Sequence, residues 1–408
     1  MSAIHDALER WLGANEAKAV AFLAELVKVP SDTPPGDNAP HARRAAELLA
    51  GLGFEVERHE VPPRAVAEQG LRSVTNLVVR HRFGDGPTVA LNAHGDVVPP
   101  GEGWTHAPYG AEIHDGRMYG RGVAVSKSDF ATYAFALAAL RGEGRALRGS
   151  VELHFTYDEE IGGTLGPKWL LERGITRPDY AICAGFSYAI VNAHNGCLQM
   201  EAFVQGKAAH AAIPQTGVDA LRAAVAMLEE LYADAESLKK ISSRTPGIGH
   251  PTLNVGRIEG GLHTNVVPES VRFRLDRRIV PEEDAAQVES RLRALLEASA
   301  RRHPGIRLDV RRLLLADALR PAAGQEKLVG ALGKHGARVF GEPIPALGVP
   351  LYTDARHYAA AGVPAVLYGT GPRTIEESNA KRADENVSLE DLRRATRVVA
   401  CAVADLLT

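Results

Sequence analysis

The sequence contains little cysteine and no long apolar run, and its charges nearly balance. The three cysteines of the 408-residue chain, Cys183, Cys197 and Cys401, form no Cys-x-x-Cys pair, so neither a disulfide framework nor a thiolate zinc site is indicated. A reducing cytoplasm is therefore the simplest compartment. No apolar run approaches the roughly 20 residues of a membrane span, and residues 1–17 lack the pattern of a secretory signal. A net charge of −3 gives no strong attraction to nucleic acid or to an anionic membrane.

Apolar residues make up 45% of the chain, which is enough to bury a core. Strand-like and helical stretches alternate as far as residue 184, which favours an α/β layer with a largely parallel sheet. We expect this α/β part to comprise residues 1–195 and 314–408. Its predicted helices cover 14–29, 42–52, 129–141, 167–173 and 389–406, and its predicted strands cover 54–58, 76–80, 88–92, 150–157 and 180–184.

The middle of the chain, residues 196–313, has a different order of elements. Strand, helix, strand, strand, helix and strand follow one another, which is the ferredoxin-like arrangement. The sequence therefore predicts an inserted α+β domain. Its predicted elements cover 198–204, 218–238, 253–259, 269–279, 282–301 and 307–313.

Two polar clusters follow apolar strands of the α/β part. His94 and Asp96 stand just beyond one strand, and Asp158, Glu159 and Glu160 stand beyond another. Strand ends are where ligands bind in α/β sheets. A His and an Asp two residues apart suit a metal ligand with its orienting carboxylate, and one of two adjacent glutamates can be a general base. Taken alone, each cluster also fits a solvated turn.

Further motifs are weak when each is considered by itself. A glycine-rich turn, Gly120-Arg121-Gly122, precedes Lys127. The inserted domain carries His210 between Gly206 and Pro214, Asn265 three residues before Pro268, and Arg278 two residues after Asp276. An isolated histidine is usually structural, and an arginine after a strand is usually at the surface.

Taken in order, these segments resemble the co-catalytic zinc peptidases, a family that includes acetylornithine deacetylase, succinyl-diaminopimelate desuccinylase, aminoacylase and glutamate carboxypeptidase. The resemblance runs over nearly the whole chain, from 26–37 to Glu385. It implies a zinc-peptidase-like α/β catalytic domain with an inserted ferredoxin-like lid and dimerisation domain. It also implies cleavage of an amide beside an amino-acid carboxylate.

The resemblance assigns roles residue by residue. In the α/β domain, His94 matches a histidine ligand, Asp96 its orienting partner, Glu159 the general base and Glu160 a second ligand. In the lid, His210 matches the histidine that completes the active site, often from the partner subunit. The lid residues that hold the substrate and its carboxylate are matched by Asn265 and Arg278.

Three of the five ligand positions do not match. Val125 stands where the family has a bridging aspartate, Gly185 where it has a second carboxylate and Lys381 where it has the last histidine. Two remaining ligands are too few for a zinc site, and a protonated lysine is not a ligand. We therefore expect no metal and no cofactor, and a Glu160–Lys381 ion pair instead. Because the ligand is lost, we also expect the peptide bond between Val125 and Ser126 to be trans.

The surviving groups favour acid–base chemistry without metal. The first hypothesis is a racemase or epimerase that acts at Cα of an N-acyl or peptide-like amino acid. Its expected catalytic residues are Glu159, His210 and Lys381. The alternatives are an amide hydrolase with one weakly held metal or none, and a non-catalytic binding protein. A small carboxylate substrate and a homodimer formed through the lid are expected in each case. The expected substrate-binding residues are Asn265, Arg278, His94, Glu160 and Lys127.

Overall fold

The computed structural model describes residues 3–143 and 147–408. The chain divides into two compact units, each with its own apolar core. Unit 1 comprises Met1–Asn192, Pro321–Leu347 and Thr353–Thr408, and unit 2 comprises Ala193–Arg320 and Gly348–Tyr352. The assignment of a catalytic role to the first and a lid role to the second stays a prediction.

Unit 1 is built on a mixed eight-stranded sheet. At its centre β3 runs parallel to β6 and β7, and β14 runs parallel to β7, whereas β1, β2 and β8 pair in antiparallel fashion. The expectation of a largely parallel sheet therefore holds for the centre and not for the edges. The strands, in sheet order, are β1 (Glu57–Glu60), β2 (Thr75–Arg82), β6 (Ser150–Thr156), β3 (Thr88–His94), β7 (Tyr180–Cys183), β14 (Ala365–Leu367), β8 (Ile190–His194) and β13 (Ala346–Val349).

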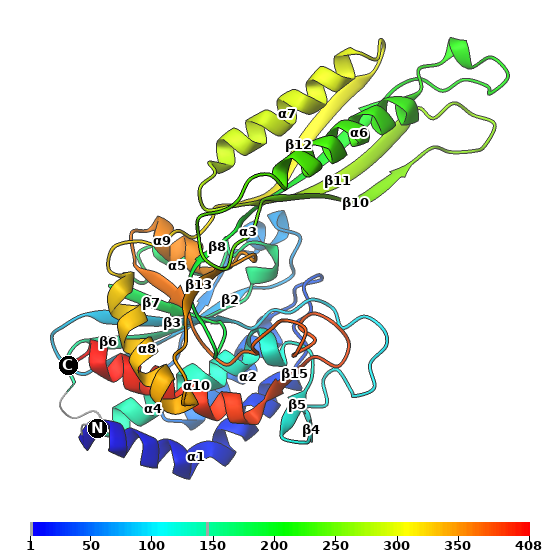
Figure 1. Cartoon of the computed structure of the whole chain (residues 1–408). Helices are drawn as coiled ribbons and strands as arrows, with labels where there is room; N and C mark the ends of the chain where they lie inside the picture. Colours follow the sequence, from blue (N-terminus) through cyan, green and yellow to red (C-terminus); the bar gives the residue numbers. More distant parts are fainter. Residues whose placement is uncertain (1–2, 144–146) are drawn as a thin grey trace. The chain divides into compact units, whose positions relative to one another are not determined.

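Helices cover both faces of this sheet. Figure 1 shows α5 and α9 on one side and α1, α4 and α10 on the other. Every residue of α4 from Ser128 to Leu140 is buried, so it is a central helix and not an amphipathic surface helix. The helices of unit 1 are α1 (Ala3–Val27), α2 (Ala39–Gly51), α3 (Pro63–Glu68), α4 (Ser128–Glu143), α5 (Pro167–Glu172), α8 (Gln325–Phe340), α9 (Ala355–Ala360) and α10 (Leu389–Leu406).

Helix α1 begins at Ala3, well before the predicted residue 14. Its first turns bury His5, Leu8 and Leu12. These three positions follow helical spacing, but a histidine within the apolar stripe and charged neighbours obscure the pattern in the sequence.

A small sheet of unit 1 has the order β15 (Asn386–Ser388), β5 (Arg117–Tyr119) and β4 (Glu112–His114). The hairpin β4–β5 turns at Asp115 and Gly116, whose φ angles are 49° and 73°. Positive φ at both central residues is the requirement of the type I′ turn, which an Asp-Gly pair satisfies readily. The turn fixes the register in which His114 pairs with Arg117.

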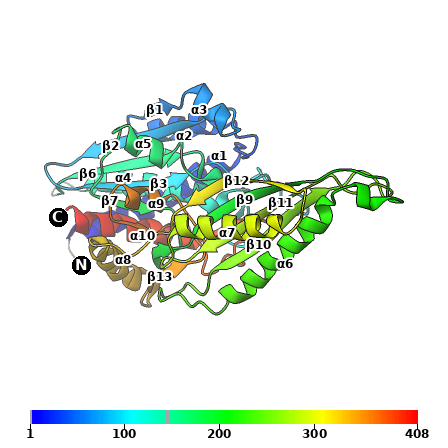
Figure 2. The same cartoon turned by 90° about the horizontal axis from the view of Figure 1, so that it is seen from above.

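Unit 2 has a four-stranded antiparallel sheet with the order β10, β11, β9, β12, as the ferredoxin-like arrangement requires. Along β11 every second residue is buried, which is the pattern of a sheet with one covered face. Figure 2 shows α6 and α7 running side by side along this sheet. The elements are β9 (Gly196–Gln205), α6 (Ala220–Leu238), β10 (Thr252–Gly260), β11 (Ser270–Ile279), α7 (Ala285–Arg301) and β12 (Arg307–Ala316).

Each long helix of unit 2 begins at an aspartate. Asp219 accepts a hydrogen bond from the Arg222 backbone N–H, and Asp284 accepts one from that of Gln287. These caps satisfy otherwise unpaired backbone donors and fix where the helices start. Within residues 3–143 and 147–408, no helix is long and apolar enough to span a membrane.

Candidate active site

The candidate active site lies at the carboxyl ends of β3 and β6. His94 is the last residue of β3, and Glu159 and Glu160 begin a short 3₁₀ turn just after β6. The two strands are parallel neighbours, and His94 pairs with Thr156. Their ends therefore meet at one edge of the sheet, which brings together polar groups that are about sixty residues apart in the chain.

Asp96 organises this edge. Its buried carboxylate accepts hydrogen bonds from the backbone N–H groups of Glu159 at 3.3 Å and Glu160 at 3.0 Å. His94 Nδ1 lies 3.0 Å from the Asp96 backbone oxygen and 3.4 Å from its Oδ1. Asp96 thus contacts the imidazole of His94 and the backbone of both glutamates. Its role as the partner that orients a metal-ligating histidine stays a prediction.

The imidazole of His94 faces Glu159. His94 Nε2 lies 3.8 Å from Glu159 Oε2, and both residues are buried. Burial disfavours the charged imidazolium, but the charges of Glu159, Asp96 and Glu160 outweigh it and raise the pKa of His94 to about 10. The arrangement places a positive group directly beside the expected general base.

Lys381 reaches the same edge from the segment before β15. Its Nζ lies 2.5 Å from Glu160 Oε2, and the Glu160 side chain is only 5% exposed whereas that of Lys381 is 49% exposed. Burial raises the pKa of Glu160 to about 7, although Lys381 acts in the opposite direction. The expected contact between the two side chains is therefore present.

Val125 lies in the turn Val123–Lys127, and the peptide bond between Val125 and Ser126 is cis. The prediction of a trans bond was wrong. Contacts that do not involve the side chain of residue 125 fix this turn. Ser126 Oγ bonds to both backbone groups of His94 at 3.0 Å, and Glu385 accepts from the Ala124 and Val125 N–H groups.

Gly185 has no space for a side chain. A Cβ added there would lie 2.8 Å from Leu367 Cβ and 2.9 Å from the Tyr368 backbone nitrogen. These distances are shorter than those of real Cβ contacts, and the opposing atoms belong to β14 and the residue after it. A carboxylate at this position would require that segment to move.

Lys127 is fully buried, and its Nζ donates to the Val29 backbone oxygen at 3.1 Å. Burial lowers its pKa to about 7, against the charges of Asp32, Glu385 and Asp96. Its predicted role in substrate binding stays a prediction.

The predicted residues of unit 2 fall into two places. His210 and Asn265 come together, since His210 pairs with Val266 and the Ala211 N–H donates to the Asn265 backbone oxygen at 2.9 Å. His210 is exposed, and its Nδ1 accepts from the Ala212 N–H. Arg278 stands near the far end of β11, about 26 Å along the strand from Ser270 at roughly 3.3 Å per residue. It is held by Asp276 at 2.8 Å.

The sequence alone did not identify Asp354, the residue before α9. Among the described residues neither of its buried carboxylate oxygens has a hydrogen-bond partner. Burial raises its pKa well above the usual value, and the charges of Glu159 and Asp158 act in the same direction. Its surroundings therefore favour the protonated carboxyl group over the carboxylate. Its only sequence signal, an aspartate before a short helix, is common.

Comparison with known proteins identifies the family. Residues 90–405 match the profile described as peptidase family M20/M25/M40. The chain belongs to this family. It is 31% identical over 392 residues to the acetylornithine deacetylase of Myxococcus xanthus, covering 94% of this chain and 96% of that protein. It is also 31% identical over 296 residues to the succinyl-diaminopimelate desuccinylase of Gluconobacter oxydans, covering 70% and 72%.

Solved structures share the fold. The dipeptidase Dug1p from Saccharomyces cerevisiae superposes with a TM-score of 0.78 at 16% identity, covering 100% of this chain and 99% of that one. An M20 family metallo-carboxypeptidase from Sulfolobus solfataricus gives 0.76 at 19% identity, covering 95% and 98%. At these identities the likeness supports the α/β domain with its inserted lid, and no more.

These relatives correct the first functional hypothesis. The curated relatives are named as a deacetylase and desuccinylases, so they point to amide hydrolysis and not to inversion at Cα. The hypothesis of a racemase or epimerase was wrong. It followed from the lost ligands together with the surviving acid–base groups, but proton-transfer groups such as Glu159 serve hydrolysis equally well. The alternative of an amide hydrolase fits these relatives better.

Proposed function

We propose that this chain hydrolyses the amide bond of an N-acyl amino acid or a similar small peptide-like carboxylate, with Glu159 as general base. The observation that carries the proposal is the placement of Glu159. Its backbone is fixed by Asp96, its residue is only 9% exposed, and its carboxylate lies beside His94. Such a carboxylate takes a proton from the attacking water and returns it to the leaving amine.

We propose that Lys381 stabilises the negative charge that develops on the amide oxygen during hydrolysis. Its ammonium is anchored by Glu160 at 2.5 Å yet remains half exposed. A fixed positive group at a partly buried edge stabilises the oxyanion that forms when water adds to the amide carbon. In this proposal Glu160 positions Lys381 and takes no proton itself.

The residues present do not fit the two-metal centre that the resemblance to co-catalytic zinc peptidases implies. Three features support this. Val125 offers no donor atom, Gly185 has no room for a side chain, and Lys381 places an ammonium on the Glu160 carboxylate. His94 and Glu160 remain, and two ligands are fewer than the three that a catalytic zinc site uses. The proposed mechanism therefore contains no step on a metal at this site.

The substrate class is proposed from the relatives and from the lid residues. Acetylornithine deacetylase and succinyl-diaminopimelate desuccinylase are named for removing an acyl group from an amino acid. We propose that His210, Asn265 and Arg278 hold a substrate of this kind by its carboxylate and amide. The homodimer through the lid and the cytoplasmic location remain predictions.

A second candidate, a binding protein without turnover, is favoured by one observation. The Glu160–Lys381 ion pair occupies two of the five ligand positions. A protein that no longer hydrolyses a substrate has no need of metal ligands at these positions. The two candidates differ in what Glu159 does. In a binding protein, substitution of Glu159 leaves the ligand affinity unchanged, and no amine is released by either the wild-type chain or the variant.

The test is a screen of N-acetyl, N-succinyl and dipeptide substrates, followed by proton NMR to detect the released amine. We expect turnover of at least one class, and a loss of about 100- to 10,000-fold in kcat for Glu159→Gln, which keeps the shape and removes the base. Ligand binding without amine release, equal in the wild-type chain and Glu159→Gln, would instead establish the binding protein.

A further inference from the structure

A second group of metal-ligating side chains lies outside the candidate active site, on the hairpin β4–β5 and the loop before it. His106, Glu112 and His114 each offer one ligand atom, and these three atoms lie within 4.8 Å of one another. All three residues belong to unit 1. Their side chains are 22%, 39% and 57% exposed, so a metal ion can reach them from solvent.

The hairpin places two of the donors side by side. Glu112 and His114 are two residues apart on β4, so their side chains point to the same face of the strand. The type I′ turn at Asp115 and Gly116 fixes that strand against β5. His114 Nε2 lies 3.5 Å from Glu112 Oε2.

The third donor is fixed from several directions. The His106 ring stacks on Tyr119 with 4.0 Å between ring centroids, and its backbone N–H donates to Asp384 Oδ1 at 3.1 Å. His106 Nδ1 lies 3.0 Å from Glu112 Oε2. The other oxygen of Glu112 accepts from the Ala107 N–H at 2.8 Å, which orients the carboxylate. Such outer contacts accompany metal ligands in proteins.

The spacing of the donors suits a tetrahedral ion. Zinc bonds to histidine and carboxylate of about 2.0–2.1 Å place neighbouring ligand atoms roughly 3.3–3.4 Å apart. The two separations from Glu112 Oε2, 3.0 and 3.5 Å, bracket that value. We propose that His106, Glu112 and His114 form a zinc site with one position open to water. Because Asp384 holds His106, an ion there braces the loop before the hairpin against the segment that follows Lys381.

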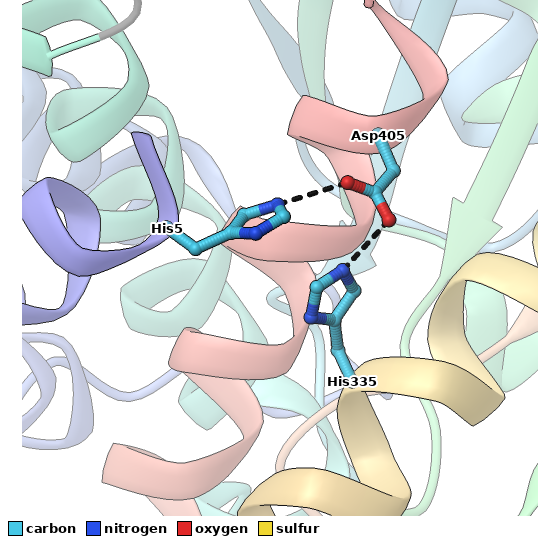
Figure 3. Close-up of side chains that lie close together, drawn as sticks. All are labelled: His5, His335 and Asp405. Atoms are coloured by element: carbon cyan, nitrogen blue, oxygen red, sulfur yellow. Dashed lines mark hydrogen bonds and ion pairs between the residues drawn. The ribbon is translucent and has the colours of Figure 1, made fainter. Parts of the chain in front are cut away.

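The other cluster of this kind serves a different purpose. Asp405 on α10 accepts from His5 Nε2 of α1 at 2.9 Å and from His335 Nε2 of α8 at 2.8 Å, as Figure 3 shows. Lys334 Nζ also lies 2.6 Å from its Oδ2. Both carboxylate oxygens are thus engaged and an ammonium stands where a cation would bind. The hydrogen bonds of this cluster link α1, α8 and α10.

The test is zinc titration of the chelator-stripped full chain by calorimetry, with thermal unfolding as a second readout. We expect one equivalent to bind and to raise Tm, because a ligand of the folded state stabilises it. His114→Ala should weaken binding by about 100-fold or more and abolish the rise in Tm. Since His114 is exposed, this variant is expected to keep its fold, and circular dichroism checks that.

Two control variants separate the site from general histidine binding. Glu57 and His59 have the same two-residue spacing on β1 and lie 3.0 Å apart. Arg80 engages that glutamate, and no third donor joins the pair among the described residues. His59→Ala and the active-site variant His94→Ala should both retain the zinc. The absence of binding, equal binding by His114→Ala, or loss in His94→Ala would each overturn the proposal. The first two outcomes leave the proposed hydrolysis untouched, whereas loss in His94→Ala would place the zinc at the candidate active site and count against the metal-free mechanism.

Discussion

The candidate active site and the hairpin cluster of His106, Glu112 and His114 offer opposite conditions to a metal ion. At the active site a valine, a glycine without space for a side chain and a lysine stand at three ligand positions. At the hairpin cluster three donors converge on one point, and no ammonium interrupts them among the contacts of the described residues. The candidate active site is thus where the resemblance expects metal ions, but the donor atoms that lie close together are those of the hairpin cluster.

The difference teaches that metal binding follows donor atoms and charge, and not fold membership. In the proposed function Glu159 acts as general base, a role that needs no metal ion. The ion pair between Glu160 and Lys381 replaces a ligand pair by a contact that satisfies both charges. In the proposed function, hydrolysis therefore does not depend on a metal ion at the candidate active site.

The largest effect is expected from restoring ligands to the active site. The double variant Val125→Asp with Lys381→His returns two of the three lost donors without placing a side chain at position 185. With His94 and Glu160 this makes four ligands, enough for a zinc site. Calorimetry should detect a second equivalent of zinc in addition to the one at the hairpin cluster.

The added equivalent must depend on the active-site histidine. Introducing His94→Ala into the double variant should remove it and leave the hairpin zinc in place. If the wild-type chain already takes up zinc that His94→Ala removes, the contrast between the two regions fails.

A smaller effect is expected from pH at the hairpin cluster. A hydrogen bond from His106 and one from the Ala107 N–H lower the pKa of Glu112, so its carboxylate stays ionised at and below the usual value of 4.5. Protons and a metal ion compete for imidazole nitrogens, because only an unprotonated nitrogen can be a ligand. Zinc affinity should fall by about tenfold or more between roughly pH 7.5 and pH 5.5. An affinity that stays constant until about pH 4.5 would show that the carboxylate alone binds the ion.

The sequence predicted much of the fold because periodicity is a local signal. Long elements such as α6 and β11 lie within a few residues of their predicted bounds. The resemblance placed His94 and Glu159 in one site, and the two side chains lie 3.8 Å apart where β3 and β6 end. The pair of Glu160 and Lys381 was expected from the resemblance.

The remaining features depend on tertiary contacts that no local pattern carries. The hairpin cluster requires the register of β4 and the stacking of His106 on Tyr119, which bring a loop residue to two strand residues. Asp354 was missed because its burial and lack of partners arise only when α9 packs in place. The cis bond before Ser126 was missed because contacts with His94 and Glu385, and not a ligand at position 125, determine that turn.

The central claim is that this chain hydrolyses an amide without a two-metal centre at His94 and Glu160. The most direct measurement is the rate of amine release by protein stripped with a chelator, verified by elemental analysis, beside the same protein given two equivalents of zinc. We expect equal rates within about twofold, both abolished in Glu159→Gln. A rate that disappears on stripping and returns with zinc, in a His114→Ala background that cannot use the hairpin cluster, would contradict the claim.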